Sequence, residues 1–293
     1  MIRYPITSAG LEAAIEVQKA GWLAKAKNKT AAFRTAGKLN EPDDKNSWGQ
    51  IKAVFMRLQH NKCAFCDRLL SAGRIEHDVE HFRPKNAVKA WPAKSKELQP
   101  DYRFSTGEAA DNGYYLLAYN IFNYATSCKM CNTTLKGNYF PVASQRVIDS
   151  EDFEKLKLEQ PHLIYPIGNL DDNPEDLITY RGILPIPKYR RGHKHRRARV
   201  TIDLFALDIR EDLLRLRAEI IQKLWLAFKF LSKRNVSIED ATDARSLIAT
   251  ALSPRTSQSA CARAFYDLCQ NNAIDARKFA KEADDFLSTN SNS

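Results

Sequence analysis

Apolar residues recur at helical spacing near both ends of the chain. Over residues 7–38 the apolar positions follow a Thr or Ser cap and predict one helix, with Leu11, Ala14, Ile15 and Trp22 on its inner face. Ser47 is expected to cap a second helix that runs up to Cys63. Its apolar face holds Ile51, Val54, Phe55 and Leu58.

The last hundred residues also predict helices. One long stripe contains Ile209, Leu213, Leu216, Ile220, Leu224 and Leu231. Shorter helices are expected to begin near Ser237, Thr256 and Ile274. The polar tail "STNSNS" is predicted to be disordered.

The middle of the chain has a different pattern. Residues 74–85 are predicted to be extended, 91–113 form a polar loop, and the aromatic-rich stretch 114–142 is expected to end in a short helix that begins near Cys128. Residues 148–187 carry mixed patterns with several turn signals. The sequence therefore predicts a helical region at 1–60, a central unit at 61–145, a turn-rich segment at 146–200 and a second helical region at 201–293.

Composition narrows the class of protein. The chain has 293 residues, of which 44% are hydrophobic, enough for a substantial core. No apolar run approaches the ~20 residues that cross a bilayer, and the N-terminus lacks a secretory pattern, so we expect a cytoplasmic protein without membrane contact. The net charge of +10 favours a polyanionic partner. A solvated basic face is the alternative.

Six cysteines in such a chain are not expected to form disulfides. Four fall into two pairs, "CAFC" and "CKMC", with ligands Cys63, Cys66, Cys128 and Cys131. Two such turns complete a tetrahedron around Zn²⁺ and leave no position open for water, which predicts a structural site. Buried free thiols or a redox pair are the alternatives. Cys261 and Cys269 are interpreted as small buried hydrophobes.

Three cations adjoin these cysteines in the sequence. Lys62 precedes the first pair, Arg68 follows it, and Lys129 lies within the second. Four thiolates around one Zn²⁺ carry excess negative charge, so these side chains are the expected counter-charges.

The stretch "VEHFRPK" supplies candidate chemistry. Glu80 and His81 are followed along the chain by Asn123 and then by Asn132, directly after the second cysteine pair. If zinc ties the two turns together, it also draws Asn132 towards Glu80 and His81. A neutral imidazole accepts a proton near neutral pH, and carboxylate and amide oxygens are ligands for a hard cation.

These residues resemble the HNH, or ββα-metal, nuclease family. The motifs that carry the resemblance are "CAFC", "VEHFRPK" and "NYATSCKMCNTTLKG", which cover residues 62–142. The "YFP" after the lysine and the later "NLDDNPEDLITY" are similar to HNH effectors of Septu-type and retron-linked antiphage systems. The resemblance implies a mainly α protein with a small ββα-metal nuclease core stapled by a four-cysteine zinc site.

The resemblance also implies roles. His81 would be the general base, Glu80 and Asn132 would hold a catalytic Mg²⁺ or Mn²⁺, and Asn123 would brace the loop after His81. Two features depart from the family: Glu80 is longer than the commoner Asp, and Lys136 follows Asn132 by four positions instead of three. A second "EH" pair, Glu76–His77, is expected to be exposed or to contact substrate.

Several cations are expected to contact nucleic acid. Those near the motif are Arg83, Lys85 and Lys136. Those in the basic strip, residues 188–199, are Arg190, Arg191, Arg196 and Arg197. A solvated linker is the alternative for the strip.

Together these features predict a metal-dependent endonuclease that hydrolyses DNA and serves as an effector in antiphage defence. An RNA- or tRNA-cleaving enzyme and a zinc-stapled scaffold without cleavage are the alternatives. The resemblance further implies an ATPase partner of the ABC or SMC-like kind, for which the C-terminal helices are the expected docking surface.

Overall fold

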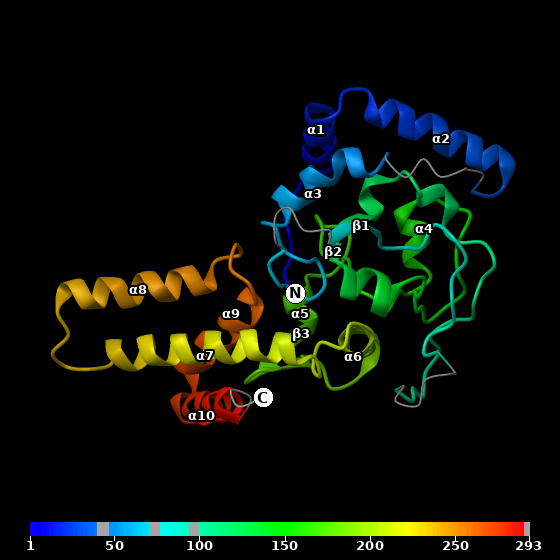
Figure 1. Cartoon of the computed structure of the whole chain (residues 1–293). Helices are drawn as coiled ribbons and strands as arrows, with labels where there is room; N and C mark the ends of the chain where they lie inside the picture. The colour runs from blue at the N-terminus through cyan, green and yellow to red at the C-terminus, as the bar shows by residue number, and fades with distance from the viewer. Residues whose placement is uncertain (40–46, 71–76, 94–99, 290–293) are drawn as a thin grey trace.

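The computed structural model describes residues 1–39, 47–70, 77–93 and 100–289, and these are mainly helical (Figure 1). Glu76 and residues 290–293 of the predicted disordered tail lie outside this part of the chain. The helices of the N-terminal half are α1 (Ser8–Gln18), α2 (Trp22–Ala36), η1 (Gly49–Ile51), α3 (Lys52–Leu58), η2 (Tyr115–Leu117), η3 (Ile121–Asn123) and η4 (Met130–Lys136). Those that follow are α4 (Phe153–Lys157), α5 (Pro174–Leu177), α6 (Gly192–Leu204), α7 (Glu211–Leu231), α8 (Ile238–Leu252), α9 (Ser259–Asn271) and α10 (Ala273–Thr289).

The first predicted helix is in fact two, so that prediction was wrong. The chain turns between α1 and α2 at Gly21, whose φ of 75° lies in the left-handed region. The carboxylate of Glu16 accepts hydrogen bonds from the backbone N–H groups of Gly21 (2.7 Å) and Leu23 (3.0 Å), which satisfies free donors at the start of α2. A glycine and a nearby carboxylate therefore end one helix and start the next.

Two strands and a helical segment form the centre of the molecule. Strand β1 (His77–His81) pairs antiparallel with β2 (Tyr124–Cys128), so that His81 lies opposite Tyr124 and His77 opposite Cys128. The chain then enters η4, a π-helix, directly after β2. This β–β–helix order agrees with the predicted strand and with the predicted helix near Cys128.

The loop after β1 is held close to the aromatic segment. A Cβ on Gly113 would lie 1.9 Å from the backbone oxygen of Asn86, so only glycine fits there. The N–H of Tyr114 donates to the oxygen of Pro84 at 2.8 Å. This contact fixes the path of residues 84–86, which line the pocket described below.

A second hairpin and the helices α6 to α10 make up the C-terminal part. Strands β3 (Ile178–Arg181) and β4 (Leu184–Pro187) pair antiparallel, and α7 and α8 lie side by side and extend away from the central strands (Figure 1). The predicted stripe is shifted: Ile209 lies before α7 and is exposed, and the buried face of α7 also includes Arg217. No helix in the described part of the chain is both long and apolar enough to cross a bilayer.

The basic strip does not form the linker considered as its alternative. Most of it lies in α6, which also crosses the expected boundary at residue 200.

Cys261 and Cys269 lie buried in α9, as predicted, and burial raises the pKa of Cys261 to about 12.

Candidate functional site

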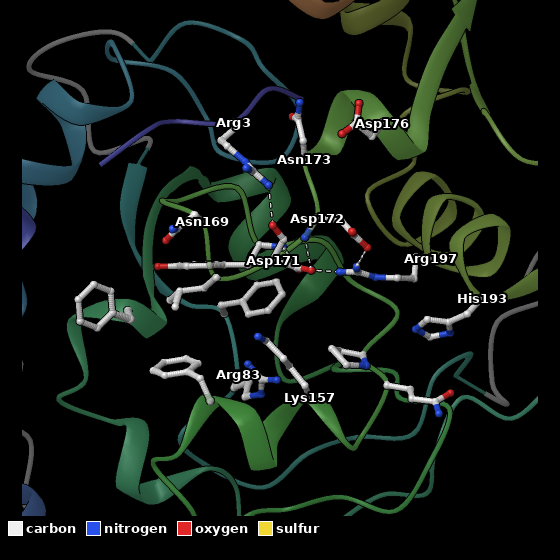
Figure 2. Close-up of a pocket in the computed structure, with 17 residues that line it drawn as sticks. Arg3, Arg83, Lys157, Asn169, Asp171, Asp172, Asn173, Asp176, His193 and Arg197 are labelled. Atoms are coloured by element: carbon white, nitrogen blue, oxygen red, sulfur yellow. Dashed lines mark hydrogen bonds and ion pairs between the residues drawn. The ribbon is translucent and has the colours of Figure 1, made fainter. Parts of the chain in front are cut away.

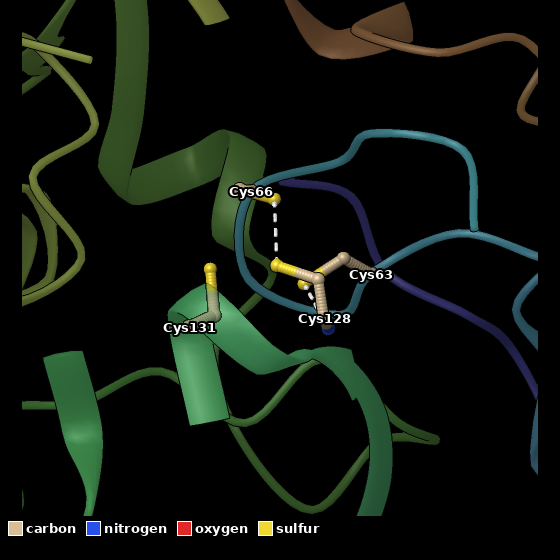
Figure 3. A group of neighbouring side chains, drawn as sticks. All are labelled: Cys63, Cys66, Cys128 and Cys131. Atoms are coloured by element: carbon tan, nitrogen blue, oxygen red, sulfur yellow. Dashed lines mark hydrogen bonds between the residues drawn. The ribbon is translucent and has the colours of Figure 1, made fainter. Parts of the chain in front are cut away.

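The two cysteine pairs meet, as the sequence predicts (Figure 3). All four residues are buried, and their sulfur atoms lie within 4.8 Å of one another. A tetrahedral zinc site with Zn–S bonds of about 2.3 Å needs sulfurs about 3.8 Å apart, and the Sγ atoms of Cys66 and Cys128 are 3.9 Å apart. A disulfide needs about 2.05 Å. The four thiols are therefore placed to bind one metal ion, and their geometry fits zinc.

A buried glutamine joins the two cysteine-bearing segments. Gln59 follows α3, and its amide nitrogen donates to the backbone oxygens of Lys62 (2.9 Å) and Thr126 (2.8 Å). Its amide oxygen accepts from the N–H of Thr126 at 2.7 Å. The first cysteine turn is thus fixed to β2 by hydrogen bonds as well as by the thiols.

A cation that contacts the cysteines comes from outside the motif. Arg210, just before α7, donates from Nη1 to the sulfur of Cys131 at 3.4 Å. Two of the expected counter-charges bind carboxylates instead. Lys62 pairs with Asp67 at 2.6 Å, and Arg68 pairs with Asp212 at 3.5 Å.

Three polar residues of "VEHFRPK" line one pocket of about 280 Å³ together with Asn132; they are Glu80, His81 and Lys85. Glu80 and His81 reach it from the end of β1, and Asn132 reaches it from the first turn of η4. Asn138 adds to the polar lining. The pocket offers the carboxylate of Glu80 and asparagine side chains, whose oxygens are the kind of ligand that Mg²⁺ or Mn²⁺ prefers. Oε1 of Glu80 is ion-paired with Lys136, so a bound cation would have to share this carboxylate with the lysine.

The hydrogen bond of His81 assigns its tautomer. Nε2 lies 3.0 Å from the backbone oxygen of Ala118, and because a carbonyl only accepts, Nε2 carries the proton. Nδ1 is then the basic nitrogen. Burial, with the positive charge of Lys85 nearby, lowers the pKa of His81 to about 3. The imidazole is therefore neutral near pH 7, which is the form that accepts a proton.

Aromatic rings fix the orientation of the imidazole. Trp48 and Tyr124 each meet the His81 ring edge-on, with centroids 5.0 Å away. The ammonium of Lys85 lies 3.9 Å from the centroid of Trp48. Trp48 had no role in the sequence prediction, because nothing in its neighbourhood marks it as part of a site.

Lys136 differs from the expectation that it contacts phosphate. It is fully buried, forms an ion pair with Oε1 of Glu80, and donates to the backbone oxygen of His81 at 3.0 Å. Burial raises the pKa of Glu80, while the charge of Lys136 acts in the opposite direction. Lys136 therefore points inward, where it holds Glu80.

Asn123 contacts the backbone directly after His81. Its Oδ1 accepts from the N–H of Arg83 at 2.7 Å, and its Nδ2 donates to the oxygen of Arg83 at 2.9 Å. Nδ2 also lies 3.2 Å from the oxygen of Leu117. These bonds tie Asn123 to the segment that directly follows His81.

Two other expected nucleic-acid contacts are buried, so the structure contradicts those predictions. Arg83 pairs with Glu159 at 3.3 Å, and its guanidinium lies 5.0 Å from the Phe140 ring centroid. Arg197 pairs with Asp171 (2.6 Å) and Asp172 (2.7 Å). Figure 2 shows Arg197 bound to both carboxylates. These residues and Arg83 line one pocket, which has a volume of about 600 Å³. Both arginines bind acidic side chains of the protein itself.

His77 is also buried, contrary to the expectation that it is exposed or contacts substrate. It lies opposite Cys128 in the strand pair and does not line the pocket that holds His81. Of the remaining cations in the basic strip, Arg190 and Arg191 are exposed and Arg196 is half-buried.

The comparisons with known proteins give one distant homologue. The chain is 25% identical over 167 residues to Septu protein PtuB from Bacillus mycoides (strain KBAB4), a match that covers 55% of this chain and 48% of that protein. The chain thus spans about half the length of the curated relative it matches. No family model matches it. No solved structure matches it either.

Proposed function

We propose that this protein is a metal-dependent endonuclease of the HNH kind that hydrolyses DNA phosphodiester bonds as part of a Septu-type antiphage defence system. The observation that carries the proposal is the shared pocket of Glu80, His81 and Asn132 beside the four-cysteine cluster. The distant homology to Septu protein PtuB supports the defence role.

The proposed chemistry begins at Nδ1 of His81. With Nε2–H held by the oxygen of Ala118, Nδ1 takes the proton of a water molecule that attacks the phosphate. Glu80 and Asn132 would hold the divalent ion, which when bound supplies positive charge at the phosphate and the leaving oxygen. Asn123 would keep the segment after His81 in place, and Lys85 is the proposed phosphate contact at the pocket.

A pKa of about 3 makes His81 a weaker base than an ordinary imidazole, and we propose that the substrate strengthens it. Burial beside Lys85 lowers its pKa, and a bound phosphate would add negative charge near the ring. Negative charge favours the protonated imidazole, so the substrate itself would make His81 a stronger base. The base would then be strongest when a phosphodiester occupies the pocket.

The decisive experiment compares His81→Ala with His77→Ala, two histidines of the same strand. Plasmid, linear duplex, single strands and tRNA are incubated with Mg²⁺ or with Mg²⁺ omitted, and zinc content and melting temperature are measured for each variant. We expect His81→Ala to lower the rate by ~10²–10⁴-fold at unchanged substrate affinity, while His77→Ala stays active. If His81→Ala cleaves at the wild-type rate, the proposed active site is wrong.

The same assay separates the alternative functions. Cleavage of tRNA without cleavage of DNA would establish an RNA-directed enzyme. Binding without cleavage under all conditions would support a scaffold. A native pull-down that recovers an ATPase would support the proposed ABC or SMC-like partner, and recovery of a free monomer that cleaves any DNA would contradict it.

A further inference from the structure

An open groove of about 840 Å³ lies between residues 100–104 and the start of α6. It shares no lining residue with the pocket of Glu80 and His81. Its basic lining residues are Arg103, Arg190, Arg191, His195, Arg196 and Arg199. The acidic ones are Asp101 and Asp203.

The positive charges of the groove are unevenly neutralised. Arg199 is held by Asp203 (2.5 Å) and Asp208 (2.8 Å). In contrast, Arg103, Arg190 and Arg191 are exposed, and none forms an ion pair within the described ranges. Three guanidinium groups therefore face solvent together, as expected for a surface that binds a polyanion.

Aromatic rings lie among these arginines. Tyr102 and Phe104 are half-buried and stack with centroids 4.8 Å apart. The guanidinium of Arg196 lies 5.4 Å from the Phe104 centroid, and the His162 ring lies 5.3 Å from the same centroid. Phe104 and Arg196 are called the Phe104–Arg196 layer below. Arginine planes and aromatic rings are the groups on which unpaired bases stack.

The beginning of α6 adds to the attraction for anions. Its cap residue, Arg191, makes no side-chain hydrogen bond to the first turn. The free N–H groups of a 13-residue helix carry partial positive charge at this end. The helix start thus reinforces a charge pattern that the arginines already set.

We propose that this groove binds an unpaired nucleic acid strand, with Arg190 and Arg191 on phosphates and the Phe104–Arg196 layer under a base. The inference rests on the proposed nuclease function and deepens it, because it adds a strand-binding surface separate from the cleavage pocket. Unpaired strands are favoured over duplex because a duplex stacks its bases internally and cannot use the aromatic layer. The groove then holds a single-stranded part of the substrate.

The test measures binding by the full chain in the His81→Ala background without added Mg²⁺. Fluorescence anisotropy is recorded for a dye-labelled oligothymidylate, an oligouridylate and a duplex of equal length across a range of salt concentrations. Phe104→Leu, which keeps an apolar side chain but removes the ring, is expected to weaken oligothymidylate binding by about 5-fold or more, with a smaller effect on duplex. Melting temperatures show whether each variant is folded.

A second set of measurements tests the proposed phosphate contacts with the double variant Arg190→Ala/Arg191→Ala. Loss of two phosphate contacts should flatten the slope of log affinity against log salt by about 1.4 for a single strand. The matched control is Arg277→Ala/Lys278→Ala, which removes two exposed cations of α10 and should leave the slope unchanged. Comparison of oligothymidylate with oligouridylate shows whether DNA or RNA is the preferred strand.

Two results would overturn the inference: equal losses for duplex and single strand in Phe104→Leu, or an unchanged salt slope in the arginine variant. Neither depends on catalysis. If the groove binds single strands as expected but the protein cleaves no nucleic acid, only the proposed nuclease function is contradicted. If the protein cleaves nucleic acid but the groove variants bind single strands as the wild type does, only the groove inference is contradicted.

Discussion

Replacement of Lys136 by methionine tests the interior of the proposed site. Lys136 is fully buried, and Glu80, its ion-pair partner, is 5% exposed. Lys136→Met keeps the length of the side chain but leaves a buried carboxylate without its cation, a change that typically costs about 3–5 kcal/mol. Burial already raises the pKa of Glu80, and loss of the Lys136 charge raises it further. This favours the neutral carboxyl, so the expected cost lies at the lower end of this range.

The expected loss is therefore about 3 kcal/mol. At about 2–4 °C per kcal/mol for a chain of this size, the melting temperature should fall by roughly 6–12 °C. The assay is urea unfolding followed by circular dichroism at fixed free zinc, with the melting temperature measured separately. Lys223→Met, an exposed lysine of α7, is the matched control and should change stability by less than ~0.5 kcal/mol.

A double-mutant cycle isolates the pair. Glu80→Gln/Lys136→Met removes both charges and should recover most of the loss caused by Lys136→Met alone, with a coupling energy of about 2 kcal/mol. Additive effects of the two changes would show that the ion pair does not link these residues. Unaltered stability of Lys136→Met would refute the reasoning about the buried carboxylate.

Three further predictions concern zinc, Asn123 and pH. Elemental analysis should find about one zinc per chain. Cys128→Ser should lose this zinc and show a sharp fall in melting temperature, whereas Cys261→Ser should retain it. Equal zinc content in the two variants would contradict the four-cysteine site. Asn123→Ala leaves the buried backbone groups of Arg83 without partners, so the free energy of unfolding measured in urea should fall by ~3 kcal/mol. A loss below ~0.5 kcal/mol would show that these bonds do not brace the segment. Burial lowers the pKa of His162 to about 4, so between about pH 6.5 and 4 the unfolded chain binds the proton first and stability falls as pH decreases. His162→Gln should show a weaker dependence over this window, and a dependence equal to wild type would refute the assignment.

Local patterns predicted much of the fold and the cluster of four cysteines. Helical periodicity located α3 and the C-terminal helices, because an amphipathic helix repeats its buried face every three to four residues. The CxxC spacing likewise encodes the cysteine site, since two thiols on one tight turn reach the same ion. The sequence pattern missed the break at Gly21, where a glycine and the Glu16 carboxylate act together over a few residues.

The charged residues show where local pattern is insufficient. Arg83, Lys136 and Arg197 carry the same charge as Arg190 and Arg191, yet the first three are buried against carboxylates and the last two face solvent. The sequence shows that a residue is cationic, but it does not show which distant acidic side chain that residue contacts in the folded protein. The expected phosphate contacts therefore divide into internal ion pairs and surface cations only once the chain is folded.

By itself, the sequence determined most of the helical regions and the two CxxC pairs. It also set the order of Glu80, His81, Asn123 and Asn132 along the chain. These features depend on side-chain type and short spacing. The tertiary structure alone decided that Arg210 contacts Cys131 across 79 positions and that Lys136 holds Glu80 across 56. Such contacts arise because burial of a charge requires a partner at hydrogen-bond distance, and only packing of remote segments determines which partner is there.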